Sequence, residues 1–190
     1  IASARSQLST HAFAALNPLL EGAGAETLVR REGMLFVYET RRSLERAGYS
    51  LEIARHFGVK FQEIDGNEVR ELEPALGPNV RHGVRFPDNG HTTNPLRLTR
   101  ALAHHFVANG GSILTEHVNS IQTLDDGKPK VETNTGCHTS DAVVLAAGAW
   151  SGRIAASLNC NVPLATERGY HAMIGSPGVS LQSPVTLSDR

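Results

Sequence analysis

The sequence predicts an α+β fold, in which a mixed sheet is packed against helices. Apolar residues recur at helical spacing near the N-terminus and again before residue 60. Short alternating or β-branched runs, bounded by glycine and proline, lie between these helices and dominate the second half of the chain. The sequence shows no internal repeat and no low-complexity segment, which argues against a repeat architecture.

Composition and charge exclude several classes of function. The 190 residues, 40% of them hydrophobic, can bury a core in one large domain or two small ones. A net charge of −1 without a long run of one sign argues against nucleic-acid binding. No apolar run approaches the roughly 20 residues of a membrane span, and no signal-peptide pattern is present, so we expect a cytoplasmic protein. Cys137 and Cys160 lack a C-x-x-C spacing and are expected to be free thiols, buried or half-buried.

The first predicted element is a helix over residues 2–20, with leucine and alanine at helical spacing. Gly22–Gly24 ends it. This glycine pair superficially begins a G-x-G-x-x-G pattern, but Thr27 stands where the third glycine would be. Because a helix rather than a strand precedes the pair, we reject it as a dinucleotide-binding motif.

The middle of the chain carries clear boundary residues. Thr40 and Asp65 are suited to cap helices, and Asn94 followed by Pro95 is a typical helix start. Asn89-Gly90 predicts a turn, and Gly110-Gly111 is expected to end the helix that begins at Pro95. The expected elements are a strand over 33–39, one helix from Thr40 to Gly58, a strand over 59–64, a short helix over 68–73, a strand over 80–86, a turn over 87–90 and a helix from Pro95 to Gly110.

The second half is expected to be mainly strands. The expected elements are strands over 112–115, 117–123 and 141–145, a hairpin of 130–135 with 137–140, a helix over 153–158, and strands over 168–174 and 185–187.

Residues 141–151 are the most informative segment of the second half. Its four consecutive apolar residues, two of them β-branched, predict a buried strand, and the small residues that follow let the backbone approach another molecule closely. Ligands of open α/β sheets bind at the carboxyl ends of strands. We therefore expect a ligand at Ala146–Ser151, with a tight turn that binds nothing as the alternative.

Several segments in this order resemble one family. They are residues 71–76, 87–95, 110–111, 116–118, 141–151, 162–164 and 167–171. Together they resemble the FAD-dependent D-amino-acid oxidase family, and within it most closely the D-amino-acid dehydrogenase branch.

The resemblance implies a two-domain flavoenzyme. It assigns residues 1–111 and 161–190 to a domain that covers the substrate, and residues 112–160 to the FAD-binding domain. The family's N-terminal G-x-G-x-x-G strand-turn-helix and its glycine-rich C-terminal segment do not occur in this sequence. The chain is therefore expected to be an internal fragment that binds FAD weakly or not at all and is inactive alone.

The implied reaction is hydride transfer from the α-carbon of a D-amino acid to flavin, giving a keto acid and ammonia. In the dehydrogenase branch the electrons pass to a membrane quinone. Oxidation of glycine, sarcosine or proline within the same family is an alternative. An alternative of another class is a non-catalytic binding or dimerisation domain that self-associates through a truncated sheet edge.

The resemblance places Val118 against the adenine ring through its backbone, and Ala147, Gly148 and Trp150 along the cofactor. An ordinary strand valine is the alternative for Val118. Trp150 is also expected to be partly a core residue.

For substrate binding the expected residues are Arg168, Tyr170 and His91. Arg168 and Tyr170 are two positions apart and would share one face of a strand, where a guanidinium and a phenol suit a carboxylate. A surface arginine with a core tyrosine is the alternative. His91 follows a turn, and a polar loop residue is its alternative.

No metal site is expected, since His104 and His105 point in different directions on a helix and no Cys/His cluster occurs. A solvated basic patch is expected at Arg30, Arg31, Arg41, Arg42 and Arg46. Contact of this patch with anionic lipid, which would place the protein at the inner face of the membrane, is left as an alternative.

Overall fold

The structure is a computed structural model that describes residues 2–188, and the chain divides into two units. Unit 1 contains residues 1–111 and 175–190, and unit 2 contains residues 112–174. The assignment of these segments to a substrate domain and an FAD-binding domain stays a prediction. Within the described residues, no helix combines the length and the apolar character needed to cross a membrane.

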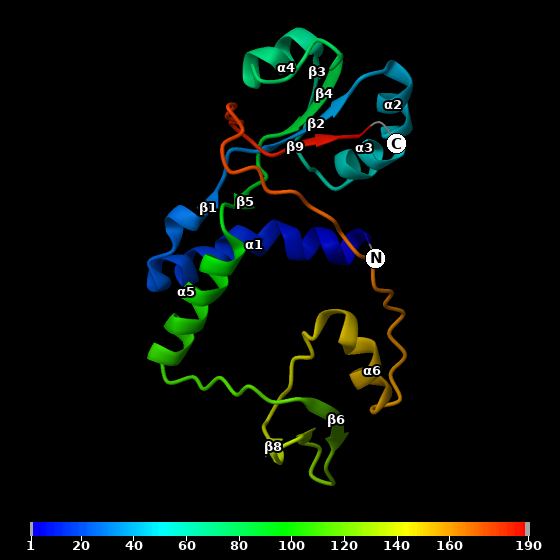
Figure 1. The fold of residues 1–190 in the computed structure, drawn as a ribbon. Helices are drawn as coiled ribbons and strands as arrows, with labels where there is room; N and C mark the ends of the chain where they lie inside the picture. Colours follow the sequence, from blue (N-terminus) through cyan, green and yellow to red (C-terminus); the bar gives the residue numbers. More distant parts are fainter. Residues whose placement is uncertain (1, 189–190) are drawn as a thin grey trace. The chain divides into compact units, whose positions relative to one another are not determined.

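Unit 1 is built around a four-stranded sheet with the strand order β3-β4-β2-β9 (Figure 1). β3, β4 and β2 are antiparallel neighbours, whereas β9 runs parallel to β2. The elements are α1 (Ala2–Ala23), η1 (Glu26–Leu28), β1 (Val29–Arg30), β2 (Met34–Tyr38), α2 (Arg41–Arg46), α3 (Gly48–His56), β3 (Gln62–Asp65), α4 (Gly66–Leu72), β4 (His82–Phe86), β5 (His91–Thr92), α5 (Pro95–Ala108) and β9 (Val185–Leu187).

The three predicted helix caps are confirmed. Thr40 and Asp65 each form a capping box with the residue three positions on, and the Asn94 side chain accepts a hydrogen bond from the Arg97 N–H. Each cap satisfies N–H groups that have no partner inside the helix. The hydrogen bonds from the Glu68 and Asn67 N–H groups also lower the pKa of Asp65.

Helices cover the two faces of the sheet. Leu35 and Val37 point to one face and pack with Val69 of α4. The alternate residues Phe36 and Tyr38 point to the other face, where Tyr38 packs with residues of α2 and α3. The strict alternation along β2 therefore buries both faces of this strand.

The remaining part of unit 1 is a second small core. β1 pairs with β5 as a two-stranded antiparallel ribbon. Leu20, Ala25 and Leu28 are buried beside it, with Leu98 and Ala101 of α5 packed against them. The predicted N-terminal helix is confirmed as α1, which ends two residues before Ala25.

Unit 2 consists of a three-stranded antiparallel sheet and one helix (Figure 1). Ile121, Ile154 and Ala155 are its buried apolar residues. The elements are β6 (Val118–Thr123), β7 (Pro129–Thr133), β8 (Cys137–Thr139), η2 (Gly148–Trp150) and α6 (Ser151–Ala156).

Three predicted strands are wrong. Residues 112–115, 141–145 and 168–174 are irregular, and Val144 in the middle segment is 89% exposed. A strand requires hydrogen bonds to a neighbouring strand, and none of the described strands pairs with these segments. Local composition alone does not form a ladder.

Two smaller expectations are also wrong. The helix predicted from Thr40 to Gly58 is two helices, separated at Ala47, and Gly48 stands where the second one begins. Glycine disfavours the helix interior, which accounts for a break at this point. Cys137 and Cys160 are free, as expected, but both are exposed rather than buried or half-buried.

Candidate functional site

The predicted ligand segment forms a turn that leads into a helix. Residues 141–147 are irregular, Gly148–Trp150 form η2, and α6 follows directly. Gly148 has a φ of 55°, in the left-handed region that favours glycine. A Cβ built on Gly148 would meet no atom within 4 Å, so the space beside this backbone is open. The Trp150 side chain is 68% exposed, which corrects the expectation that it is partly a core residue.

This turn is fixed to the sheet of unit 2 through Ser157, immediately after α6. The Ser157 hydroxyl accepts a hydrogen bond from the Ile121 N–H at 3.1 Å. Its one proton can be donated to the Ile154 carbonyl oxygen at 2.7 Å, within the last turn of the helix, or to the Ile121 carbonyl oxygen at 3.0 Å. β6 is an edge strand of the sheet, so Ser157 satisfies polar groups that no neighbouring strand pairs. Val118, at the start of β6, is half-buried.

Arg168 and Tyr170 lie in the irregular segment that ends unit 2. Tyr170 is 87% exposed, and Arg168 is exposed as well. No hydrogen bond or ion pair of either side chain occurs within the described residues. The expected grouping of these two residues on one face of a strand is therefore not present.

His91 lies in unit 1, on β5 opposite Arg30. Its Nδ1 atom is buried without a hydrogen-bond partner among the described residues, and so is the hydroxyl oxygen of the next residue, Thr92. A buried polar atom without a partner is uncommon in folded proteins. The other six predicted site residues all belong to unit 2.

No group of three or more His, Cys, Asp or Glu residues that could hold a metal ion occurs in the part of the chain that the structure describes. The largest pKa shift in unit 2 is that of Glu116, and hydrogen bonds within the unit cause it. Hydrogen bonds from Thr133, His138 and Thr135 lower the pKa of Glu116 from 4.5 to about 2. The His138 Nε2 atom lies 2.9 Å from Glu116 Oε2.

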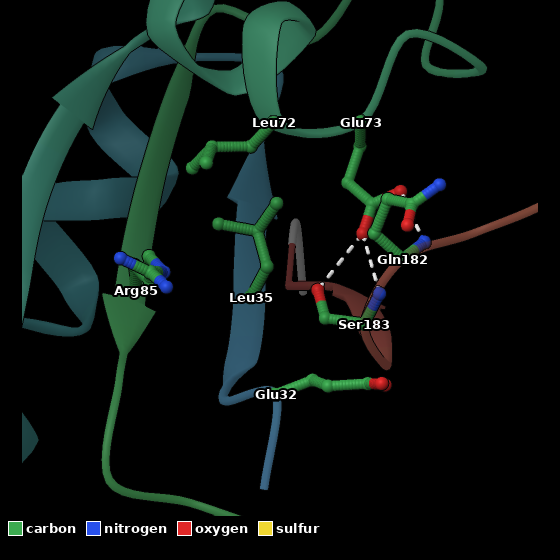
Figure 2. Close-up of a pocket in the computed structure, with 7 residues that line it drawn as sticks. All are labelled: Glu32, Leu35, Leu72, Glu73, Arg85, Gln182 and Ser183. Carbon is green, nitrogen blue, oxygen red and sulfur yellow. Dashed lines mark hydrogen bonds between the residues drawn. The ribbon is translucent and has the colours of Figure 1, made fainter. Parts of the chain in front are cut away.

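Sequence reasoning missed a pocket in unit 1. It has a volume of about 320 Å³ and lies at one face of the four-stranded sheet (Figure 2). Leu35 of β2 and Arg85 of β4 contribute to it from directly opposite positions in the register. The other lining residues are Glu32, Leu72, Glu73, Gln182 and Ser183.

Glu73 closes one side of this pocket by tying the C-terminal segment to the end of α4. Its carboxylate is 1% exposed and accepts hydrogen bonds from the Gln182 N–H at 2.9 Å and the Ser183 N–H at 2.7 Å. The Ser183 hydroxyl adds a third bond at 2.9 Å (Figure 2). The only sequence signal was Pro74, which marks a helix end at this position but does not reveal a partner over a hundred residues away.

Comparison with known proteins identifies the family. The family model described as FAD dependent oxidoreductase matches residues 2–190, which is almost the whole chain. The chain belongs to the FAD dependent oxidoreductase family. The resemblance inferred from the sequence is thereby confirmed at the level of the family.

Two relatives from Bradyrhizobium diazoefficiens are similar to this family member. A D-amino-acid oxidase is 33% identical over 172 residues, which cover 90% of this chain and 40% of the relative. A D-amino acid dehydrogenase is 28% identical over 178 residues, which cover 92% of this chain and 42% of the relative. The chain thus spans about two fifths of the length of these curated relatives.

Solved structures share the fold. The glycine oxidase from Geobacillus kaustophilus superposes with a TM-score of 0.67 at 24% identity, over 82% of this chain and 42% of that one. The glycine oxidase from Bacillus cereus gives a TM-score of 0.65 at 27% identity, over 80% and 42% of the two chains. The α+β architecture predicted from the sequence, a mixed sheet packed against helices, is confirmed by these matches.

The residues of this family member fit a contact with part of FAD. The open space beside Gly148 and the small side chains of Ala146 and Ala147 allow a flat group to lie against the backbone. A pyrophosphate site of the glycine-rich strand-turn-helix type does not occur among residues 2–188. The described residues therefore fit a contact along FAD but do not include that pyrophosphate contact.

Proposed function

We propose that this chain is part of an enzyme that deaminates D-amino acids. The observation that carries the proposal is the match of the family model over residues 2–190, together with a 33% identical relative described as a D-amino-acid oxidase. FAD, when bound, supplies the acceptor for the hydride that leaves the α-carbon. The resulting imine is then hydrolysed to a keto acid and ammonia.

In this proposal the chain's own residues position the two reactants. Val118, Ala147, Gly148 and Trp150 contact FAD in this proposal. Ala147 and Gly148 let the backbone approach FAD because their side chains are small or absent, and Val118 contributes the backbone of its strand. Unit 1 belongs to the domain that covers the substrate. The sheet and helix of unit 2, residues 112–160, belong to the FAD-binding domain.

Arg168, Tyr170 and His91 are proposed to contact the substrate. A guanidinium and a phenol can together hold an α-carboxylate with two or three hydrogen bonds. The exposure of Arg168 and Tyr170 leaves both side chains free to take such a ligand. We further propose that the electron acceptor is a membrane quinone, in line with the similarity to a D-amino acid dehydrogenase.

A second candidate is oxidation of glycine or a related small amino acid. It is favoured by the 27% identity to the Bacillus cereus glycine oxidase. The two candidates differ in the substrate and share the chemistry of hydride removal from the carbon next to nitrogen.

The experiment uses the longer protein from which this sequence comes, supplied in turn with D-alanine, L-alanine, glycine and proline. Keto acid and ammonia released in equal amounts from D-alanine, and not from L-alanine, would support the proposal. Product from glycine alone would replace it with the second candidate. Turnover that is faster with a quinone analogue than with oxygen would support the proposed acceptor.

A further inference from the structure

Arg85 is a half-buried cation that has no partner among residues 2–188. It lies on β4, one of the inner strands of the sheet, and lines the pocket of Figure 2. Its side chain forms no hydrogen bond and no ion pair with any residue of the described chain. Partial burial of an unpaired charge costs free energy, so an anion bound here would be stabilised.

The two acids of the pocket do not serve as that anion. The Glu73 carboxylate is engaged by three donors from Gln182 and Ser183. Glu32 pairs with Arg30 at 3.3 Å. In Figure 2, Glu73 and Glu32 lie on the other side of Leu35 from Arg85. The guanidinium therefore keeps its donors available to a ligand.

The shape and lining of the pocket indicate the size and chemistry of the ligand. A volume of about 320 Å³ is at the small end of the range for ligand pockets. Leu35, which is 2% exposed, and Leu72, which is 38% exposed, give it an apolar wall. A guanidinium presents two parallel N–H donors that match a carboxylate.

We propose that this pocket binds a small monocarboxylate with a short apolar substituent, with its carboxylate on Arg85 and its apolar part against Leu35 and Leu72. Amino acids and the keto acids derived from them share this chemistry. The proposal goes beyond the proposed function, because binding at this pocket requires neither flavin nor turnover.

The test measures binding to the 190-residue chain by isothermal titration calorimetry. The probes are propionate, D-alanine and pyruvate, with n-propanol as the probe that lacks a carboxylate. We expect at least one of the acids to bind with a Kd on the order of 1 mM and n-propanol not to bind. If only D-alanine or only pyruvate binds, that result identifies the class of ligand. Either result supports the proposed carboxylate site.

Three variants assign the binding to Arg85. Arg85→Gln should weaken binding by about tenfold or more, because a charge-assisted pair is lost, and Arg85→Lys should restore part of it. Arg100→Gln removes an exposed arginine of α5 and serves as the matched control, with unchanged affinity. Amide shifts of Leu35 and Ser183 on titration of the unmodified chain give a second readout that does not depend on a variant's folding.

The proposal is overturned if no acid binds at concentrations on the order of 10 mM, well above the expected Kd. It is also overturned if Arg85→Gln binds as tightly as the unmodified chain, or if the amide shifts leave the pocket unaffected. Because no flavin is involved, this result is independent of whether the longer protein oxidises amino acids.

Discussion

Gly148 is the residue on which the turn into α6 depends. Its φ of 55° lies where a Cβ collides with the backbone, and a Cβ there has no other neighbour within 4 Å. Gly136, in the same unit, has equally open surroundings but no positive φ. Alanine substitutions at the two positions therefore isolate the effect of the positive φ at Gly148, because an added Cβ is crowded at neither position.

We predict that Gly148→Ala destabilises unit 2 by roughly 1–2 kcal/mol, the cost of placing a side chain in the left-handed region. Gly136→Ala should change the free energy of unfolding by less than about 0.5 kcal/mol. Urea unfolding followed by the fluorescence of Trp150, the one tryptophan in the sequence, measures both. Equal effects of the two substitutions would contradict the role given to the backbone of Gly148.

Glu116 makes the stability of unit 2 depend on pH in the acid range. Because its pKa in the folded protein is about 2 and its ordinary value is 4.5, the ionised form is favoured by folding. This stabilisation is complete above about pH 4.5 and is lost as the pH falls toward 2.

Thr133→Val should raise the pKa of Glu116 toward 4.5, since the Thr133 hydrogen bond is the largest cause of the shift. The carboxyl ¹³C chemical shift of Glu116, followed from pH 7 to acid, measures this directly, with the unmodified chain as the reference. An unmodified Glu116 that titrates near 4.5 would refute the hydrogen-bonded arrangement around it.

Among the elements, the link between α6 and β6 positions the candidate cofactor turn. The Ser157 hydroxyl accepts a hydrogen bond from the Ile121 N–H on the open edge of the sheet, and its proton lies within reach of the Ile154 and Ile121 carbonyl oxygens. Ser157→Ala should leave the Ile121 N–H without this acceptor and destabilise unit 2 by about 1–3 kcal/mol. Ser151→Ala, at the start of α6, is the control and should have little effect, because the Ser151 side chain forms no hydrogen bond with any residue of 2–188. Urea midpoints that are the same for both variants would show that Ser157 does not hold the helix.

Structural features that depend only on residues close in sequence could be predicted. The caps at Thr40, Asp65 and Asn94 are decided by a side chain and N–H groups within three residues. The strands at 141–145 and 168–174 were wrongly predicted, because a strand is decided by a partner that local composition does not name. β9 was correctly predicted, and its partner β2 lies about 150 residues earlier in the chain.

The candidate site shows the same division. The turn at Gly148 and the small residues before it were evident in the sequence. The pocket between Arg85 and Glu73 was not, because it requires the register of β2 with β4 and a contact between residues 110 positions apart. The roles of the predicted site residues all remain predictions; these residues are His91, Val118, Ala147, Gly148, Trp150, Arg168 and Tyr170.

At the scale of the whole molecule, the proposed function requires the family's cofactor, FAD. The chain covers 40–42% of the two relatives described above, and the glycine-rich phosphate motif does not occur in its sequence. Unit 2 exposes apolar side chains, among them Val144, Trp150 and Tyr170.

The most direct measurement is the visible spectrum of the full-length protein that contains this chain. The spectrum is recorded without oxygen, before and after addition of D-alanine. The account predicts a flavin band that is present at the start and bleaches when D-alanine is added. A band that persists would keep FAD and discard D-alanine as the substrate. A protein without a flavin band, even after incubation with FAD, would contradict the proposed function.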